Sequence, residues 1–168
     1  MRKPKIFLIG DNHFHHCIIN TYCQRPFKNI DEMSETLIQN WNKTVGKQDI
    51  VYVLGDFALC GKDKIIEVGK GLKGRKRLIL GNHDKASLQT YREAGFEYFY
   101  NHEVFLSEYD CILFHIPLEN CKYRNIHAHT HNKEVNDKNH FCVSVEKINY
   151  TPILLSEAIN YFEELENG

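Results

Sequence analysis

The chain of 168 residues carries a formal net charge of −1, with 42% hydrophobic and 26% charged residues. This composition is typical of a globular domain with a substantial core, so we expect residues 1–168 to form a single domain. The balanced charge argues against a broad basic surface for nucleic acid, and no apolar run approaches the roughly 18 residues that span a membrane.

The N-terminal segment and the cysteines both favour a cytoplasmic protein. Residues 1–5 lead directly into a strand-like run and lack the long apolar region of a signal peptide. The six cysteines are scattered and form no Cys-x-x-Cys pair, a pattern typical of buried, reduced thiols. We therefore expect a cytoplasmic location, and the sequence leaves the oligomeric state open.

The first half of the chain predicts three strand–helix units. Apolar runs at 5–9, 50–54 and 77–80 predict buried strands, and each is followed by a glycine. Asp31 is the predicted N-cap of a helix that ends at Gly46. A shorter helix is predicted between Gly61 and Gly74, and another over residues 87–94.

The second half changes to short strand-like runs at 103–106, 111–114, 125–128 and 141–145, separated by polar turns. Ser156 is the predicted cap of a closing helix with Ala158, Ile159, Phe162 and Leu165 on one face. This order of elements favours an α/β fold in which two sheets pack face to face with helices outside.

Side chains that can bind metal ions follow five of the predicted strands. Any one of them could be an ordinary cap or surface residue, but five such coincidences are hard to explain in that way. Oxygen and imidazole donors without thiolate suit Mn²⁺, Fe or Zn²⁺ at a hydrolytic centre better than a structural zinc site. These side chains are Asp11 with His13, Asp56, Asn82 with His83, His115, and the run from His127 to His131.

These residues resemble, in order, the five sequence blocks of the calcineurin-like metallophosphoesterases. The blocks are Asp11-x-His13, Gly55-Asp56, Gly81-Asn82-His83-Asp84, His115 and Ala128-His129-x-His131. Neighbouring stretches resemble a small bacterial and phage branch of that family: residues 11–16, 25–27, 52–57 and 143–145. The resemblance implies a four-layer αββα sandwich of two packed mixed sheets.

The chain departs from the family pattern at two positions. Ala128 stands where the family usually has glycine, and a positive φ there would cost an alanine about 1 kcal/mol. His15 stands where the branch usually has glycine.

The resemblance also implies which residues hold two divalent ions. Asp11, His13 and His131 would bind one ion, and Asp56 would bridge to the second. The remaining ligands of the second ion would be Asn82, His115 and His129. Mn²⁺ is the favoured metal, with Fe, Zn²⁺ or Ni²⁺ as alternatives. Two such cations roughly 3.5–4 Å apart polarise a phosphoryl group and lower the pKa of a bridging water, which yields hydroxide near neutral pH.

Other residues near the blocks have weaker claims. His127 alternates with His129 and His131, so a strand would place all three on one face. We interpret His127 as a supporting imidazole. His16 and Arg25 are candidate substrate contacts, with a surface histidine and an arginine paired to a nearby acid as the alternatives.

His83 and Asp84 are the predicted catalytic pair. His83 neighbours a metal ligand and is placed to donate a proton to the leaving group or to stabilise phosphoryl oxygens. Asp84 could orient the His83 imidazole and raise its pKa, or cap the helix that follows, and the two roles are compatible.

The sequence therefore predicts a metal-dependent phosphoesterase, a hydrolase that cleaves phosphomonoester or phosphodiester bonds of a small phosphorylated substrate. The alternatives are a nuclease that acts on polynucleotides and a non-catalytic metal-binding scaffold protein. Intact ligand blocks and the presence of His83 favour an enzyme. The near-neutral charge leaves nucleic acid open as a substrate without favouring it.

Overall fold

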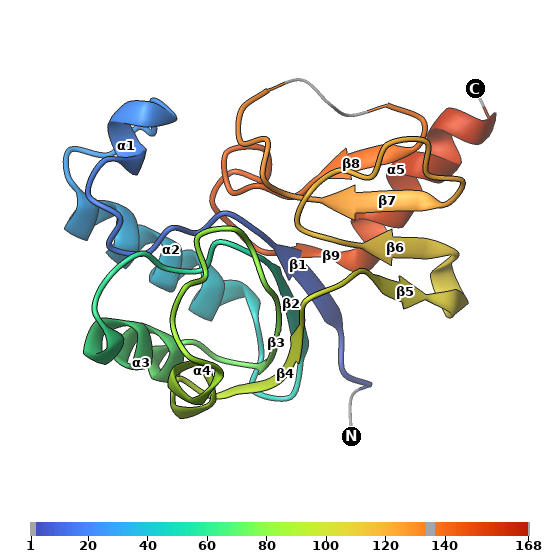
Figure 1. Ribbon diagram of the computed structural model, residues 1–168. Helices are drawn as coiled ribbons and strands as arrows, with labels where there is room; N and C mark the ends of the chain where they lie inside the picture. The colour runs from blue at the N-terminus through green and yellow to red at the C-terminus, as the bar shows by residue number, and fades with distance from the viewer. Residues whose placement is uncertain (1–2, 134–136, 168) are drawn as a thin grey trace.

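A computed structural model describes residues 3–133 and 137–167 and shows two β-sheets packed between layers of helices (Figure 1). The first sheet has the strand order β4-β3-β2-β1-β9, and only β9 is antiparallel to its neighbour. Its strands are β1 Ile6–Ile9, β2 Ile50–Leu54, β3 Arg75–Ile79, β4 Phe96–Tyr100 and β9 Ile153–Leu154. Both sheets are mixed, as the sequence predicted.

The second sheet has the order β5-β6-β7-β8, with β5 antiparallel and the other three strands parallel. Its strands are β5 Val104–Leu106, β6 Cys111–Leu113, β7 Arg124–His127 and β8 His140–Cys142. A short 3₁₀ helix, Ser107–Tyr109, joins β5 to β6. The predicted strand at 141–145 is shorter than expected, because the chain leaves the sheet after Cys142.

Helices cover the outer faces of both sheets, which gives the expected four layers (Figure 1). On the side of the first sheet lie α1 Ile19–Tyr22, α2 Ile30–Thr44, α3 Lys62–Gly71 and α4 Leu88–Glu93. The closing helix α5, Leu155–Asn167, packs on the second sheet, where the ring of Phe162 contacts Phe141. None of the helices in the described part of the chain is long and apolar enough to cross a membrane.

Helix boundaries differ from the sequence prediction at three caps. The N-cap of α2 is Asn29, whose side chain accepts the amide of Glu32, so Asp31 lies in the first turn. Ser87, rather than Asp84, caps α4 by accepting the amide of Thr90. At the other end of the chain, α5 begins at Leu155 rather than at a Ser156 cap, and Leu165 is 48% exposed.

The two sheets meet next to the first block. Gly10 pairs with Ser144 in a parallel bridge, and its amide donates to the carbonyl of Val143. A Cβ on Gly10 would lie 2.4 Å from the Cβ of Ala128, so the methyl group of Ala128 is accommodated because residue 10 is glycine. Ala128 does not adopt a positive φ, and its departure from the family pattern therefore carries no backbone penalty.

Candidate metal centre

The carboxyl ends of five parallel strands deliver the predicted metal ligands to one place. Asp11 and His13 follow β1, Asp56 follows β2, Asn82 follows β3, His115 follows β6, and His129 and His131 follow β7. Their donor atoms form two sets whose members lie within 4.8 Å of one another: Asp11, His13 and His131, and Asp56, His115 and His129. The predicted ligand Asn82 joins the second set through its Oδ1, which lies 3.0 Å from His115 Nε2. The assignment of these residues to two ions stays a prediction.

The backbone at this centre is held in a conformation that L-residues seldom adopt. Five of the predicted ligands have φ between 51° and 69°: Asp11, His13, Asp56, His129 and His131. A left-handed conformation costs roughly 1–2 kcal/mol per residue, and such strain gathers at functional sites. His15 also has φ 55°, so the second departure from the family pattern places a histidine where glycine would be unstrained.

In the first ligand set, two buried donor atoms have no hydrogen-bond partner among the described residues. Asp11 Oδ2 accepts the amide of His129 at 2.7 Å and the hydroxyl of Ser144 at 2.5 Å. Asp11 Oδ1 is buried without a hydrogen-bond partner among the described residues, and so is His13 Nε2. The Nδ1 atoms of His13 and His16 lie 3.1 Å apart, which directs the other nitrogen of His13 into the centre.

In the second set, acceptor atoms of His115, Asn82 and His129 lie close together. His115 Nδ1 donates to the carbonyl of Leu54 at 2.8 Å, so His115 Nε2 carries the lone pair in the neutral ring. That nitrogen lies 3.0 Å from Asn82 Oδ1 and 3.2 Å from His129 Nδ1. Acceptors at such distances repel unless a proton or a cation lies between them.

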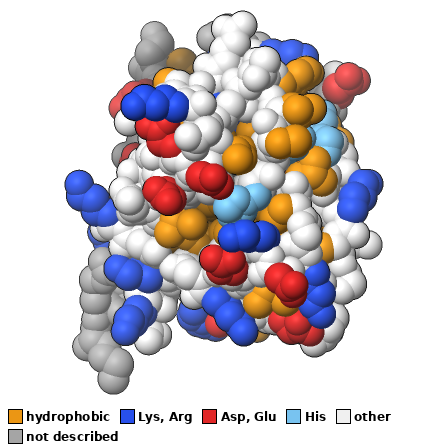
Figure 2. Space-filling view, turned by 90° about the vertical axis from the view of Figure 1, so that its left-hand side faces the viewer, with side chains coloured by type: hydrophobic (Ala, Val, Ile, Leu, Met, Phe, Trp, Pro, Cys, Tyr) orange, Lys and Arg blue, Asp and Glu red, His pale blue; other side chains and the backbone are white. Residues whose placement is uncertain are grey.

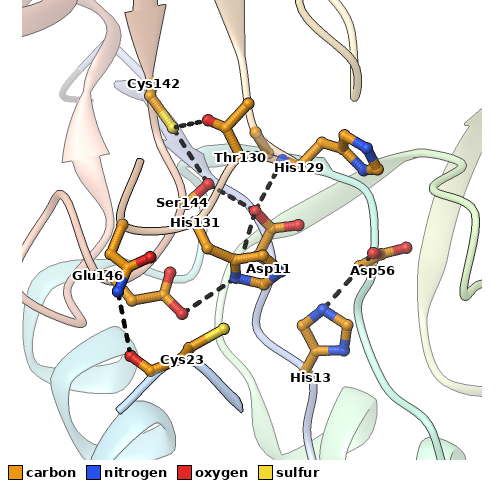
Figure 3. A network of polar contacts seen from close by, with 12 residues as sticks. Asp11, His13, Cys23, Asp56, His129, Thr130, His131, Cys142, Ser144 and Glu146 are labelled. Carbon is orange, nitrogen blue, oxygen red and sulfur yellow. Dashed lines mark hydrogen bonds and ion pairs between the residues drawn. The ribbon is translucent and has the colours of Figure 1, made fainter. Parts of the chain in front are cut away.

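Asp56 belongs to the second set and also faces the first. Its Oδ2 lies 3.5 Å from His13 Nε2 and 3.5 Å from His115 Nε2, while Oδ1 accepts the amide of His83 at 2.8 Å (Figure 3). Gly81 makes room for this carboxylate, because a Cβ at that position would lie 2.2 Å from Asp56 Oδ1. One carboxylate therefore faces both ligand sets.

Burial makes the charges of the centre unfavourable in the absence of cations. It raises the pKa of Asp11 to about 7 and lowers the pKa of His13 to about 2. Burial also lowers the pKa of His115 and of His129. Neutral imidazoles and carboxylates are the forms that bind metals, so a divalent pair would supply the missing positive charge and the missing partners. The residues fit two metal ions.

A family model for the calcineurin-like phosphoesterases matches residues 4–164. The chain belongs to this family. Its members hydrolyse phosphoester bonds with divalent metals, and the two ligand sets of this calcineurin-like phosphoesterase are where such metals would be held.

The chain is also similar to individual proteins and solved structures. An uncharacterized protein of Methanocaldococcus jannaschii is 36% identical over 98% of this chain and 94% of its own length. The Gene 66 protein of Mycobacterium phage D29 is 44% identical over 34% of this chain and 30% of its own. The Aquifex aeolicus protein of unknown function AQ665 aligns with a TM-score of 0.73 at 24% identity, covering 95% of this chain and 100% of that one. Pseudomonas putida nuclease MPE aligns with a TM-score of 0.51 at 17% identity, covering 75% and 61%, which shows a shared fold alone.

Arg25 of this phosphoesterase is placed differently from a substrate contact. Its guanidinium is buried and donates to the carbonyls of Asp11 at 2.7 Å and Asn12 at 2.9 Å. It also forms an ion pair with Glu146 at 2.8 Å, the arrangement that the sequence left as the alternative. With its donors engaged inside the protein, Arg25 holds the first ligand loop instead of gripping phosphate.

Asp84 does not serve the two roles that the sequence proposed for it. Its carboxylate accepts the amides of Asp56, Phe57 and Gly81 at 2.8–3.0 Å and the hydroxyl of Tyr91 at 3.1 Å. Ser87 caps α4 instead. Burial raises the pKa of Asp84 to about 6 although these donors favour the carboxylate. Asp84 thus ties the Asp56 loop to the Gly81 loop.

We predict that Asp84→Asn destabilises the fold by about 3 kcal/mol, because an amide NH₂ would face backbone amides that need an acceptor. Chemical denaturation monitored by circular dichroism measures this loss. Asp31→Asn is the matched control, since the Asp31 side chain is 79% exposed, and should stay within about 0.5 kcal/mol of wild type. A denaturation midpoint of Asp84→Asn equal to that of the control would contradict the tying role.

His83 and His16 lie at the wall of a cavity of about 410 Å³ that opens on the metal centre. The His83 ring is 5.3 Å from the His13 ring and 5.9 Å from the His16 ring, measured between centroids. His16 lines this cavity and also contacts His13 through Nδ1, and its role as a substrate contact stays a prediction. His83 is half-buried, follows the exposed Asn82 in the chain, and lines the same cavity as several of the predicted ligands.

The three alternating histidines do not share one strand face. β7 ends at His127, and the positive φ values of His129 and His131 turn the chain, so these two point into the centre. His127 is fully buried, and its Nδ1 lies 2.8 Å from the carbonyl oxygen of Ala128. Burial lowers the pKa of His127 to about 4, so the ring is neutral and supports the loop from beneath.

Three residues near the centre carried no sequence prediction of their own. Ser144 orients Asp11, Glu146 pairs with His131 at 3.1 Å, and Cys23 contacts the same histidine. Ser144 belongs to the Val143-Ser144-Val145 stretch that resembles the phage branch, so a signal for it was present. For Glu146 and Cys23, only the tertiary fold brings them to the site.

Proposed function

We propose that this calcineurin-like phosphoesterase hydrolyses phosphomonoester or phosphodiester bonds of a small phosphorylated substrate with a pair of divalent ions. Mn²⁺ is the favoured metal, and Fe, Zn²⁺ and Ni²⁺ are the alternatives. The observation that carries the proposal is the pair of ligand sets that meet at Asp56, with unpartnered donor atoms directed into them. Every ligand block and His83 are present, which favours an enzyme over a scaffold protein.

When bound, the two metals would polarise the phosphoryl group and acidify a water nucleophile. The protein's own part begins with Asp11, which Ser144 and the His129 amide hold so that one oxygen faces the centre. His83 lies at the cavity side of the ligands, where its imidazole can donate a proton to the leaving oxygen. The backbone amide of His83 donates a hydrogen bond to Asp56, which fixes the position of residue 83 relative to the proposed ligands.

The direct test is turnover of bis-p-nitrophenyl phosphate or p-nitrophenyl phosphate by the purified protein. We expect hydrolysis with Mn²⁺, complete loss after EDTA treatment, and recovery when Mn²⁺ is added back, because the ligand sets contain no group that could replace the cations. Release of p-nitrophenolate is followed by absorbance. Metal binding without turnover of either ester, with every metal named above, would identify a scaffold protein and sink the proposal.

A second candidate function is a nuclease, and one observation favours it. Tyr22 is 76% exposed and Ile18 is 61% exposed, and both line the cavity beside the metal centre. Figure 2 looks onto the side that carries α1, and hydrophobic side chains gather near the top of this face beside a histidine. An exposed aromatic ring beside a phosphate-binding centre is a surface on which a base can stack.

Comparing turnover of single-stranded DNA, cyclic nucleotides and p-nitrophenyl esters separates the two candidates. A polynucleotide substrate should bind with an affinity that falls steeply as salt rises, because backbone phosphates release counterions on binding. With a net charge of −1, we expect a shallow salt dependence and preference for the small esters.

We also propose a cytoplasmic location and a single domain over residues 1–168. The family match over residues 4–164 supports one domain. The cysteines are scattered along the chain with no Cys-x-x-Cys pair, a pattern that suits reduced thiols in a reducing compartment.

A further inference from the structure

A third group of metal-ligating side chains lies beside the proposed pair. Donor atoms of Cys23, His131 and Glu146 lie within 4.8 Å of one another. Cys23 directly follows α1, His131 comes from the loop after β7, and Glu146 from the segment after β8. Figure 3 shows Glu146 and Cys23 on the side of His131 away from Asp56. Neither Cys23 nor Glu146 belongs to the ligand sets described above.

Glu146 is held with one oxygen unused. Its side chain is 6% exposed, and Oε1 accepts Arg25 at 2.8 Å and faces His131 Nδ1 at 3.1 Å. Oε2 is buried and has no hydrogen-bond partner among the described residues. A buried carboxylate oxygen without a partner is costly unless a cation or a donor completes it.

The donor types select the kind of ion. A thiolate, an imidazole and a carboxylate are the ligands of zinc sites, and three protein ligands leave a coordination position for water. The thiol proton of Cys23 leaves as the cation binds, so Cys23 adds a negative charge to that of Glu146, which Arg25 already partly neutralises. Harder ions such as Mg²⁺ or Mn²⁺ gain little from a sulfur ligand.

We propose that Cys23, His131 and Glu146 form a separate site for a thiophilic divalent cation, Zn²⁺ in the first place. Cys23 and His131 both line the cavity of about 410 Å³, which provides the path of entry. Cys23 is only 4% exposed, so the site lies at the base of that cavity.

Occupation of this site competes with the proposed metal pair, and this step rests on the proposed function. His131 Nδ1 lies 3.1 Å from Glu146 Oε1 and 4.0 Å from Asp11 Oδ2, so the same nitrogen faces both ligand sets (Figure 3). One nitrogen lone pair binds one cation. Zinc held by Cys23 and Glu146 therefore withdraws His131 from Asp11 and His13 and inhibits the enzyme.

The site itself is tested with Co²⁺, which replaces zinc and gives an intense thiolate-to-metal absorption band in the near ultraviolet when sulfur is bound. The protein is stripped with a chelator and titrated with Co²⁺. We expect the band in wild type and its loss in Cys23→Ser and Cys23→Ala. The exposed Cys17 provides the matched control, and Cys17→Ser should keep the band.

This spectrum needs no turnover, so it stands even if the phosphoesterase proposal fails. Circular dichroism checks that each variant is folded. Two substitutions at Cys23 are used so that the test can still be made if one variant does not fold. Absence of the band in folded wild type, or its persistence in both Cys23 variants, overturns the site.

Competition is tested by adding Zn²⁺ to the Mn²⁺-loaded protein. We expect inhibition in wild type, and an increase of at least about tenfold in the half-inhibiting zinc concentration in Cys23→Ser, in keeping with the loss of one ligand. Equal zinc sensitivity in both proteins would overturn the competition while leaving the cobalt result to decide the site.

Discussion

Asp56→Asn is expected to lower turnover by about 100- to 1000-fold and to reduce the metal retained after dialysis. The substitution conserves shape but replaces one carboxylate oxygen with an NH₂ group and removes the negative charge. Asp56 Oδ2 is equally distant, at 3.5 Å, from His13 Nε2 and His115 Nε2, so its carboxylate faces both ligand sets. Elemental analysis and ester hydrolysis measure the two effects.

The control for Asp56→Asn is Asp63→Asn, which changes an exposed carboxylate in the first turn of α3. It should retain wild-type metal content and turnover, because its charge lies outside both ligand sets. If Asp56→Asn kept full metal content and full turnover, Asp56 would not be the shared ligand.

His83→Ala is expected to lower turnover by about 10²–10⁴-fold while metal content stays near that of wild type. The His83 ring lies at the cavity wall. The backbone amide of residue 83 donates to Asp56, and alanine keeps this hydrogen bond. The side chain is therefore separable from the ligands. A fall in kcat with unchanged metal stoichiometry is the signature of a proton donor.

His102→Ala provides the matched histidine control, because His102 is exposed and its Nδ1 contacts only the neighbouring carbonyl of Glu103 among the described residues. Its turnover should equal that of wild type. The leaving group p-nitrophenolate needs no proton, so His83→Ala should lower the turnover of a p-nitrophenyl ester by a smaller factor than the turnover of an alkyl phosphate. Equal losses on both substrates would remove the assigned role of His83.

The candidate metal-binding side chains could be located in the sequence because they follow strands of regular pattern, and the resemblance then implied which seven are ligands. Apolar runs such as 50–54 end at a glycine, and the polar group after it is obliged to lie at the edge of a parallel sheet. The resemblance of the five blocks implied the division between two ions, and the structure brings the donor atoms into two groups. The fold class followed from the same alternation of strands and helices.

Two strands and one helix were missed for local reasons. β9 spans two residues, and α1 spans four, so neither carries a periodic signal. β4 reads Phe96–Tyr100 with its second and third residues exposed, and its aromatic content after Gly95 was the available cue. Such short elements form because the rest of the sheet or loop supports them.

The roles that the sequence left open or misassigned belong to polar groups whose partners lie far away in the chain. Arg25 pairs with Glu146, 121 positions later, and Asp84 binds the amides of Asp56 and Phe57, 28 and 27 positions earlier. A buried charge takes whatever partner the fold brings to it, and a local motif cannot state which one that is.

By itself, the sequence determined the family and the two-sheet architecture and predicted the candidate metal ligands, because these depend on patterns within single strands and the turns after them. Only the tertiary structure decided what holds the ligands and what competes for them. Asp84 ties two loops, Ser144 turns Asp11, and His131 faces both Asp11 and Glu146. These contacts join the ends of separate strands. Asp84 links two neighbouring strands of the first sheet, whereas the contacts of Ser144 and His131 with Asp11 form only when the two sheets pack together.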